Sequence, residues 1–252
     1  MTIPSKNFER LDRALVSQGF FDTRARAQAA IRAGLVKIND APAAKPAQPV
    51  GAGDILGVDG AAHPFVSRGG VKLDHALRSL EVDPDGKICL DLGASTGGFT
   101  DVLLRTGARM VYAVDVGTGQ LHRTLTDDPR VVNLEKTHAR DLTPALIETP
   151  VEIIVADVSF ISLKKALPPA LALALPGARL VALVKPQFEV GRAQIGKGGI
   201  VKPGYENGEG LAEAMGAWIG NQQGWRFDGV IESPIAGGDG NREFLIAATN
   251  NA

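Results

Sequence analysis

Two lysines and two acidic residues are the groups in this sequence that could carry out a reaction: Lys72, Asp157, Lys185 and Glu243. A neutral lysine amine can take a proton from a hydroxyl, and a charged one can stabilise the alkoxide that forms. Neighbouring carboxylates would orient the two amines and offset their mutual repulsion. Such pairs are ordinary salt bridges in most proteins, so their meaning depends on whether the fold brings all four together.

The expected order of elements places these four residues at one edge of a parallel sheet. Asp157 and Lys185 each follow a strand, and open α/β sheets bind ligands at the carboxyl ends of their strands. Glu243 begins a last strand that we expect to run antiparallel, so its start reaches the same edge. Lys72 comes from a helix before the sheet and would close the group from above.

Strand-like and helix-like segments alternate from residue 88 onward. We expect strands at 88–92, 110–114, 131–134, 153–156 and 179–184, and helices at 98–106, 163–175 and 206–223. This alternation predicts a mainly parallel sheet with helices on both faces. Segments 226–233 and 243–248 have no long helix between them, which predicts an antiparallel hairpin at one edge of the sheet.

The residues from Asp91 to Thr100, in the pattern D-L-G-x-x-x-G-G, predict a glycine-rich turn between a buried strand and a helix. Such a junction holds nucleotide-like ligands. The spacing is neither G-x-G-x-x-G nor that of a P-loop. It resembles the first motif of class I methyltransferases, which use S-adenosylmethionine. That resemblance implies cofactor-binding roles for five residues of the turn: Gly93, Ser95, Thr96, Gly97 and Gly98.

Two further acids follow the next two strands. Asp115 comes directly after the second strand, where Rossmann-like folds place an acid that accepts hydrogen bonds from ribose hydroxyls. Asp141 follows the third strand and could lie near the adenine edge of the cofactor. A plain helix cap is the alternative interpretation of Asp141.

The first 50 residues form a basic segment. They contain eight Lys or Arg and four Asp or Glu, a net charge of +4 in a chain whose net charge is −1. Such a module could deliver a polyanion to a following catalytic domain, although an ordinary solvated face has the same charge. Helical spacing from Arg10 to Val16, with Gly19 as a C-cap and Thr23 as an N-cap, predicts two helices before a short strand at 35–40.

This succession resembles the α-L RNA-binding domain over residues 8–60. The matching residues are Arg10, Leu11, Asp12, Leu15, Gly19, Thr23, Arg24, Ala27, Ile31, Gly34, Val36, Ile38, Asn39, Lys45 and Pro46. Thr23 stands where serine is usual and Asp40 where glycine is usual. The resemblance implies phosphate contacts from basic residues of the two helices and the following strand, and our candidates are Arg13, Arg24, Arg26 and Lys37.

The remaining motifs resemble the FtsJ-like RNA 2′-O-methyltransferases, whose K-D-K-E tetrad matches Lys72, Asp157, Lys185 and Glu243. Matching text includes the segments 157–163, 185–189 and 196–201, and Ser67 as a further cofactor residue. The pairing with an α-L domain is similar to the TlyA family. That resemblance implies 2′-O-methylation of cytidine in ribosomal RNA, within ribosomal subunits, with S-adenosylmethionine as the methyl donor.

These observations predict a small α+β module at residues 1–60, a linker at 61–70 and a class I, Rossmann-like methyltransferase domain at 71–252. Its sheet would have seven strands and end in the antiparallel hairpin. We interpret the glycine-rich segment 188–199 either as a mobile basic lip that closes over RNA or as an ordinary surface loop.

Composition constrains the alternatives. The longest apolar stretch, 166–175, contains two prolines and is too short to span a bilayer, and the N-terminus lacks the apolar core of an export signal. One cysteine and four histidines without metal-ligand spacing favour a metal-free cytoplasmic protein. The alternatives are a non-catalytic RNA-binding assembly factor and a membrane-active haemolysin. The oligomeric state cannot be inferred from the sequence.

Overall fold

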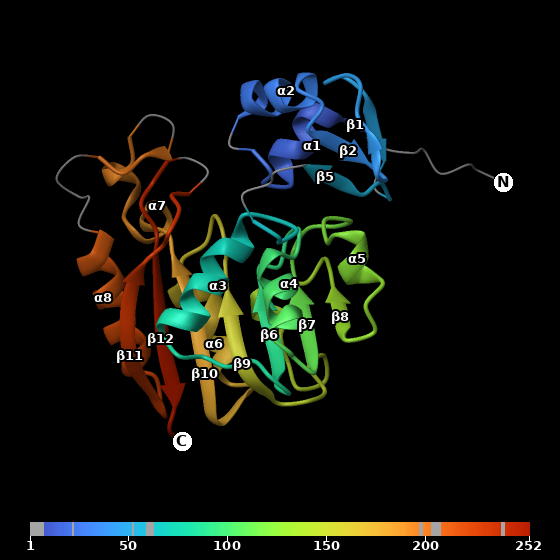
Figure 1. Cartoon of the computed structure of the whole chain (residues 1–252). Coiled ribbons are helices and arrows are strands. Elements are labelled where there is room, and N and C mark those ends of the chain that lie inside the picture. Colours follow the sequence, from blue (N-terminus) through green and yellow to red (C-terminus); the bar gives the residue numbers. More distant parts are fainter. Residues whose placement is uncertain are drawn as a thin grey trace.

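The computed structural model describes residues 8–21, 23–51, 53–58, 63–196, 199–202, 208–237 and 240–252. These residues form an N-terminal module, residues 8–58, and a larger α/β part (Figure 1). The module lies beside the sheet edge at which β6 and β7 end. The catalytic groups predicted above belong to the same edge.

The N-terminal module packs two helices against short strands. Its elements are β1 (Phe8–Arg10), α1 (Leu11–Ser17), α2 (Arg24–Arg32), β2 (Val36–Ile38), β3 (Ala41–Pro42), β4 (Pro49–Gly51) and β5 (Leu56–Val58). Thr23 caps α2 as predicted, because its hydroxyl accepts a hydrogen bond of 3.3 Å from the Arg26 amide. Gly19 follows the C-cap of α1 in the left-handed conformation. The two helices share a buried apolar cluster with β2, β4 and β5.

Seven strands form the central sheet, in the order β11-β12-β10-β9-β6-β7-β8. They are β6 (Ile88–Leu92), β7 (Met110–Val114), β8 (Val131–Leu134), β9 (Val151–Ala156), β10 (Ala174–Val184), β11 (Trp225–Glu232) and β12 (Phe244–Asn250). The neighbours from β8 to β10 are parallel, and β12 is antiparallel to both β10 and β11. The mainly parallel sheet and its terminal hairpin are therefore confirmed. β12 lies inside the sheet, between β10 and β11.

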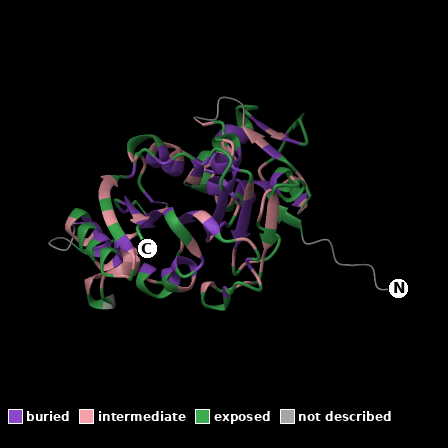
Figure 2. Cartoon of the chain, turned by 90° about the horizontal axis from the view of Figure 1, so that it is seen from below, coloured by how far each residue is buried: buried purple, intermediate pink, exposed green. Residues whose placement is uncertain are grey.

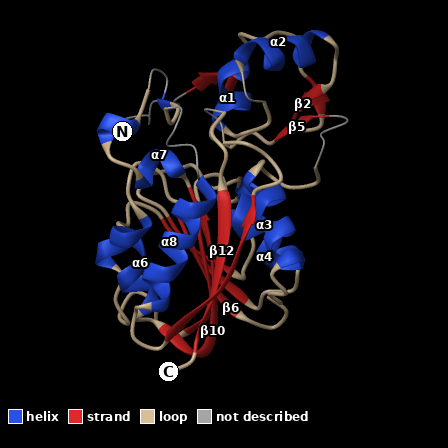
Figure 3. Cartoon of the chain, turned by 90° about the vertical axis from the view of Figure 1, so that its left-hand side faces the viewer, coloured by secondary structure: helices blue, strands red, loops and turns tan. Residues whose placement is uncertain are grey.

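Helices cover both faces of this sheet, and Figure 3 shows them on its two sides. One face carries α3 (Gly69–Ser79), α4 (Gly98–Arg105) and α5 (Arg123–Thr126); the other carries η1 (Ala139–Asp141), α6 (Leu163–Leu171) and α8 (Gly208–Gly220). Alternate strand residues face opposite clusters, since Cys89 packs with α3 and α4 while Leu90 packs with α6 and α8. Figure 2 shows the buried residues gathered along the central strands.

Several expected bounds differ from the structure by a few residues at an element end, and the largest differences are in β10, α6 and the glycine-rich segment. β10 begins at Ala174, earlier than expected, and its register shifts before Arg179, around the Pro176-Gly177 step. α6 ends at Leu171 and contains Pro168 and Pro169. The glycine-rich segment opens with the short helix α7 (Pro186–Glu189) and contains η2 (Arg192–Gln194), while its residues 197–198 lie outside the described residues.

Candidate active site

Lys185 and Asp157 form an ion pair at the carboxyl ends of β10 and β9. These strands are parallel neighbours, with Ala182 opposite Ala156, so the residues that follow them meet at the sheet edge. The Lys185 Nζ to Asp157 Oδ1 distance is 2.6 Å, and the side chains are 12% and 22% exposed. Lys185 also donates a 2.8 Å hydrogen bond to the Ser159 hydroxyl. The amine is therefore held by two oxygen groups and remains partly open to a substrate.

Lys72 and Glu243 form a second, more deeply buried ion pair. Lys72 lies on α3, and its Nζ is 2.5 Å from Glu243 Oε2, with side chains 10% and 3% exposed. Glu243 directly precedes β12, whose first residue, Phe244, pairs with Val184 at the end of β10. The antiparallel last strand therefore brings Glu243 to the edge that holds Lys185. The structure brings all four predicted catalytic residues to this edge.

The glycine turn packs closely against the loop that carries Asp157. Gly93 has a φ of +88°, and a Cβ added there would stand 2.6 Å from the Asp157 carbonyl oxygen. Gly97, the left-handed residue before α4, approaches Leu125 of α5, where a side chain would collide. Gly98 touches Ser67 in the same way. These contacts require glycine for backbone conformation and close packing, independently of any ligand.

A pocket of about 450 Å³ opens between the ends of β6, β7 and β9. Asp115 lines it, and its carboxylate accepts hydrogen bonds from the amides of Ser95 (2.8 Å) and Gly117 (2.7 Å). The lining also includes eight apolar residues: Leu92, Val114, Val116, Ala139, Val158, Phe160, Ile161 and Ala166. A planar base fits the apolar part of this wall, and a ribose fits its polar part, which includes the acids Asp115 and Asp157.

A second, polar pocket of about 350 Å³ adjoins the first. The two pockets share Gly93, Ser95, Asp157 and Ser159. The second pocket is also lined by Lys72, Lys185, Ser67, Thr96 and Gly98. Together the two cavities fit an extended molecule with a nucleoside at one end and a charged amino acid at the other, which is the shape of S-adenosylmethionine.

Asp91 lies beneath the glycine turn and is fully buried. Its Oδ2 accepts a hydrogen bond of 2.6 Å from the Thr100 hydroxyl, while Oδ1 has no hydrogen-bond partner among the described residues. Burial raises the pKa of this carboxyl to about 7, and the nearby charges of Asp157 and Asp115 act in the same direction. Asp91 therefore changes its protonation state near neutral pH, directly beneath the glycine turn.

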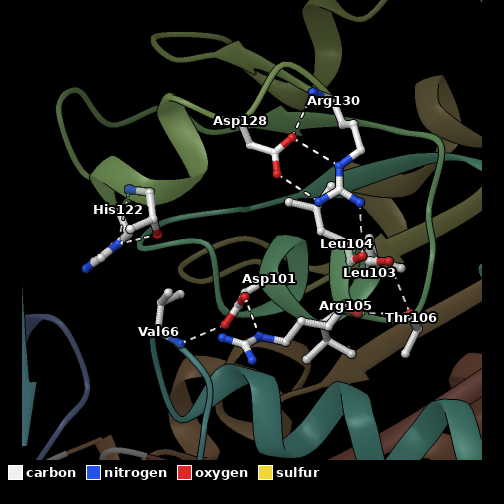
Figure 4. Close-up of polar contacts among 11 residues, drawn as sticks. Val66, Asp101, Leu103, Leu104, Arg105, Thr106, His122, Asp128 and Arg130 are labelled. Atoms are coloured by element: carbon white, nitrogen blue, oxygen red, sulfur yellow. Dashed lines mark hydrogen bonds and ion pairs between the residues drawn. The ribbon is translucent and has the colours of Figure 1, made fainter.

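The segment before α3 is fastened to α4 (Figure 4). The Val66 amide donates a 2.9 Å hydrogen bond to Asp101 Oδ2, and Arg105 Nε binds Asp101 Oδ1 at 2.7 Å. Asp101 is itself buried. This clamp fixes the neighbouring Ser67, which is buried and lines the polar pocket.

The other predicted residues occupy more varied positions. Asp141 is absent from the described residues lining either pocket; it ends η1 and forms an ion pair of 3.6 Å with Arg140. Arg13 is exposed on α1, Arg26 is exposed on α2, and Lys37 lies half-buried on β2. Arg24 is 2.9 Å from the buried Asp12, which also binds Arg10 and Gln28. Arg24 therefore has a structural partner.

Three features that line these pockets were not assigned from the sequence: Ser159, Phe160, and a group from the N-terminal module. Ser159 and Phe160 stand in the segment D-V-S-F-I-S-L, directly after Asp157, and that proximity was the available signal. Phe160 is 91% exposed, has a φ of +64° and lies 5.2 Å from the Phe188 ring. The third group, Val16, Ser17 and Gly19, belongs to the N-terminal module, and no local pattern predicts its place.

Comparison with known proteins agrees with this geometry. Residues 65–250 match the FtsJ-like methyltransferase family model, and residues 9–56 match the S4 domain model. Among the described residues, helices are too short or too polar to cross a membrane.

Individual relatives extend over nearly the whole chain. The chain is 46% identical to the 16S/23S rRNA (cytidine-2′-O)-methyltransferase TlyA of Mycobacterium tuberculosis, over 94% of this chain and 88% of that one. It is 39% identical to Hemolysin A of Brachyspira hyodysenteriae, over 94% and 98%. A solved Streptococcus thermophilus structure, provisionally named a hemolysin, superposes with a TM-score of 0.81 at 41% identity, over 98% of this chain and 90% of that one. The chain therefore belongs to the TlyA family of S-adenosylmethionine-dependent FtsJ-like methyltransferases, with an S4 domain before the catalytic domain.

Proposed function

We propose that this protein transfers a methyl group from S-adenosylmethionine to a ribose 2′-hydroxyl of ribosomal RNA, with cytidine as the modified nucleoside. The observation that carries this proposal is the Lys185 amine, held by Asp157 and Ser159 where the two pockets join. The name of the Mycobacterium tuberculosis relative supports the choice of cytidine and of ribosomal RNA.

The apolar pocket takes the nucleoside of the donor, with the Asp115 carboxylate at the ribose hydroxyls. The polar pocket takes the amino-acid end, along the backbone of Gly93 and Ser95 and beside Ser67. S-adenosylmethionine, when bound, supplies a methyl group on a positively charged sulfur. Asp141 lies inside η1 and pairs with Arg140, and it is given no role at the donor in this proposal.

Lys185 meets the ribose hydroxyl in this proposal. Its partly exposed Nζ can receive a hydroxyl proton in the neutral form, or stabilise the developing oxygen charge in the protonated form. Asp157 and Ser159 fix the direction of the amine and leave one of its positions for the substrate. Holding the oxygen in line with the methyl group supplies a further large part of the rate.

In this proposal Lys72 and Glu243 do not exchange a proton with the hydroxyl but act on it through the local electrostatic potential. Lys72 lines the same pocket as Lys185, and the Glu243 carboxylate balances its charge in a nearly water-free place. The pair therefore sets the electrostatic potential around the reacting oxygen without adding net charge. This assignment makes Lys72 and Glu243 groups that hold and orient, with Lys185 as the residue that exchanges a proton.

RNA reaches this site from the N-terminal module. Arg13 and Arg26 lie on exposed helix positions, and Lys37 on β2 extends the basic set. Arg24 contributes less to phosphate binding because its charge is shared with Asp12. Phe160, exposed beside the apolar pocket, offers a ring face to an unstacked base.

We also propose that the chain divides into an RNA-binding domain at residues 1–60, a linker at 61–70 and a methyltransferase domain at 71–252. Ribosomal subunits are the proposed substrate.

The test is methyl transfer from radiolabelled S-adenosylmethionine to ribosomal RNA and isolated ribosomal subunits, followed by nuclease digestion. We expect 2′-O-methylcytidine in the digest from the wild-type protein. A methylated base in the digest would contradict ribose chemistry. RNA binding without transfer would identify a non-catalytic assembly factor instead.

A further inference from the structure

The wall of the polar pocket includes residues from outside the methyltransferase domain. Val16, Ser17 and Gly19, at the end of α1, line the same cavity as Lys72, Lys185 and the glycine turn. α1 otherwise belongs to the N-terminal module, where Leu11, Ala14 and Leu15 pack in the module core. One helix thus has its apolar side in the module and its last residues at the catalytic cavity.

The surface opposite these residues is formed by Ser67 and Arg68, directly before α3. A Cβ added at Gly19 would stand 3.6 Å from the Arg68 amide nitrogen and 3.6 Å from the Ser67 Cβ, which is ordinary van der Waals contact. The neighbouring Val66 is held to α4 through Asp101, as Figure 4 shows. The end of α1 therefore lies against the segment before α3, and a side chain larger than alanine at position 19 would have to be placed against that segment.

Two hydrogen bonds hold the backbone at the end of α1. The Gly19 amide bonds the Val16 carbonyl at 3.0 Å, and the Phe20 amide bonds the Leu15 carbonyl at 2.9 Å. Gly19 has a φ of +78°, which turns the chain away from the helix axis. This is the hydrogen-bonded helix ending that a left-handed glycine permits. These hydrogen bonds fix the backbone of the residues that line the pocket.

We propose that Val16, Ser17 and Gly19 of the N-terminal module form a wall of the methyl-donor site, so that the position of the RNA-binding module controls how tightly the donor is held. The inference rests on the proposed function, because the polar pocket is the one assigned to the amino-acid end of the donor. It adds that the module is a structural part of the donor site. By thermodynamic linkage, RNA that holds the module against the catalytic domain strengthens donor binding, and donor strengthens RNA binding by the same factor.

The test compares two glycines that each follow a helix of the module. Gly19 and Gly34 have φ values of +78° and +73°, but among the described residues nothing lies within 4 Å of a Cβ added at Gly34. Gly19→Leu and Gly34→Leu therefore impose the same backbone strain, and only Gly19→Leu displaces the wall. The measurement is the dissociation constant of S-adenosylhomocysteine, the demethylated donor, by titration calorimetry on the full chain.

We expect Gly19→Leu to raise this dissociation constant at least about fivefold, the low end of typical coupling between sites, and Gly34→Leu to leave it at the wild-type value. Equal dissociation constants for the two variants would overturn the inference. Wild-type protein that does not bind S-adenosylhomocysteine would instead contradict the proposed donor site itself.

Hydrogen exchange of the wild-type protein decides the matter if Gly19→Leu does not fold. S-adenosylhomocysteine should slow amide exchange in a peptide covering residues 14–21 and leave residues 24–33 of α2 unchanged. Unchanged exchange in residues 14–21 at saturating ligand would overturn the inference.

Discussion

Lys87 and Glu152 form, at the amino ends of β6 and β9, a counterpart of the ion pair that Lys185 and Asp157 form at the carboxyl end of the sheet. The Lys87 Nζ to Glu152 Oε1 distance is 3.1 Å, and the side chains are 46% and 27% exposed. The two pairs share residue chemistry, and both involve β9. They differ in that only the Lys185 pair adjoins the glycine turn and the pockets.

This relationship supplies a matched control for the role of Lys185. We expect Lys185→Met to lower kcat by about 10²–10⁴-fold, the usual contribution of a group that exchanges a proton. We expect Lys87→Met to leave kcat near the wild-type value, because Lys87 lies at the opposite end of the sheet from the pockets. The folded state should also persist, since an exposed pair contributes only about 0–1 kcal/mol to stability. Single-turnover methyl transfer to ribosomal RNA measures both. Equal rates for Lys185→Met and the wild type would remove Lys185 from the proposed chemistry.

Breaking the buried pair on α3 should destabilise the protein. Glu243→Gln leaves the Lys72 ammonium buried without its counter-charge, so we expect the free energy of unfolding to fall by about 3–5 kcal/mol. Urea unfolding followed by circular dichroism measures this loss.

A double variant separates stability from catalysis at the same pair. Lys72→Met combined with Glu243→Leu removes both charges, so we expect it to regain most of the lost stability and still to lack methyl transfer. Normal transfer by this double variant would limit Lys72 and Glu243 to a structural role.

Asp91 should make stability depend on pH. The folded protein holds this proton up to about pH 7, whereas the unfolded chain releases it near 3.8, so the unfolded state binds fewer protons in between. The contribution of Asp91 to stability is therefore complete below pH 3.8 and is lost as pH rises through about 7. Asp91→Asn should remove this part of the dependence and increase stability at pH 8 relative to pH 5. An unchanged difference in urea midpoints between the two pH values would contradict the assignment.

Asp12 should be the polar anchor of the N-terminal module. Its fully buried carboxylate binds Arg10, Arg24 and Gln28, and the Arg10 guanidinium in particular holds its pKa well below the usual range. The resulting stability is present above the ordinary pKa and is lost as pH falls below it. We expect Asp12→Asn to destabilise the module by about 1–3 kcal/mol.

An exposed acid in the same module provides the comparison for Asp12. Asp40→Asn keeps a residue type that tolerates the left-handed φ of +64° found there. We expect the variant to leave amide exchange in α1 and α2 unchanged, whereas Asp12→Asn should accelerate it. Equal exchange in the two variants would show that the Asp12 contacts contribute little.

Cys89, the single cysteine of the chain, should be unreactive in the folded protein. It is buried in β6, and burial raises the pKa of its thiol to about 12. We expect an aromatic disulfide reagent, which releases a yellow thiolate when it reacts with a thiol, to label Cys89 only in denaturant. Stoichiometric labelling under native conditions would show that β6 opens.

The sequence predicts the elements that depend on local pattern. The expected bounds of β6, β7 and β8 agree with the structure, because short apolar runs end at turns in each case. Three of the four catalytic candidates, Asp157, Lys185 and Glu243, follow from their places at strand ends, whereas Lys72 comes from the helix before the sheet. In contrast, β1 is only three residues long with exposed side chains, so its pairing with β4 comes from tertiary contact.

Long-range contacts account for most of what the sequence does not reveal. Ser159 becomes a partner of Lys185 only because β9 and β10 are neighbours. Glu189 binds the Ser162 hydroxyl at 2.6 Å and the Leu163 amide at 2.8 Å, which joins the two loops after those strands. Residues 16–19 meet the catalytic pocket through domain packing. Periodicity carries no information about any of these three contacts.

The place of β12 in the sheet has a consequence for the order of folding. This strand is the last of the seven in the sequence but inserts between β10 and β11, and it carries with it the carboxylate that neutralises Lys72, 171 residues earlier. Until β12 docks, the ammonium on α3 faces the growing core without a counter-charge. Bringing together residues so far apart in the sequence costs chain entropy, and the stabilising contacts form only after that cost has been met. Because β12 brings both, the catalytic charges and the sheet are completed together, so a chain in which β12 has not docked lacks the assembled site.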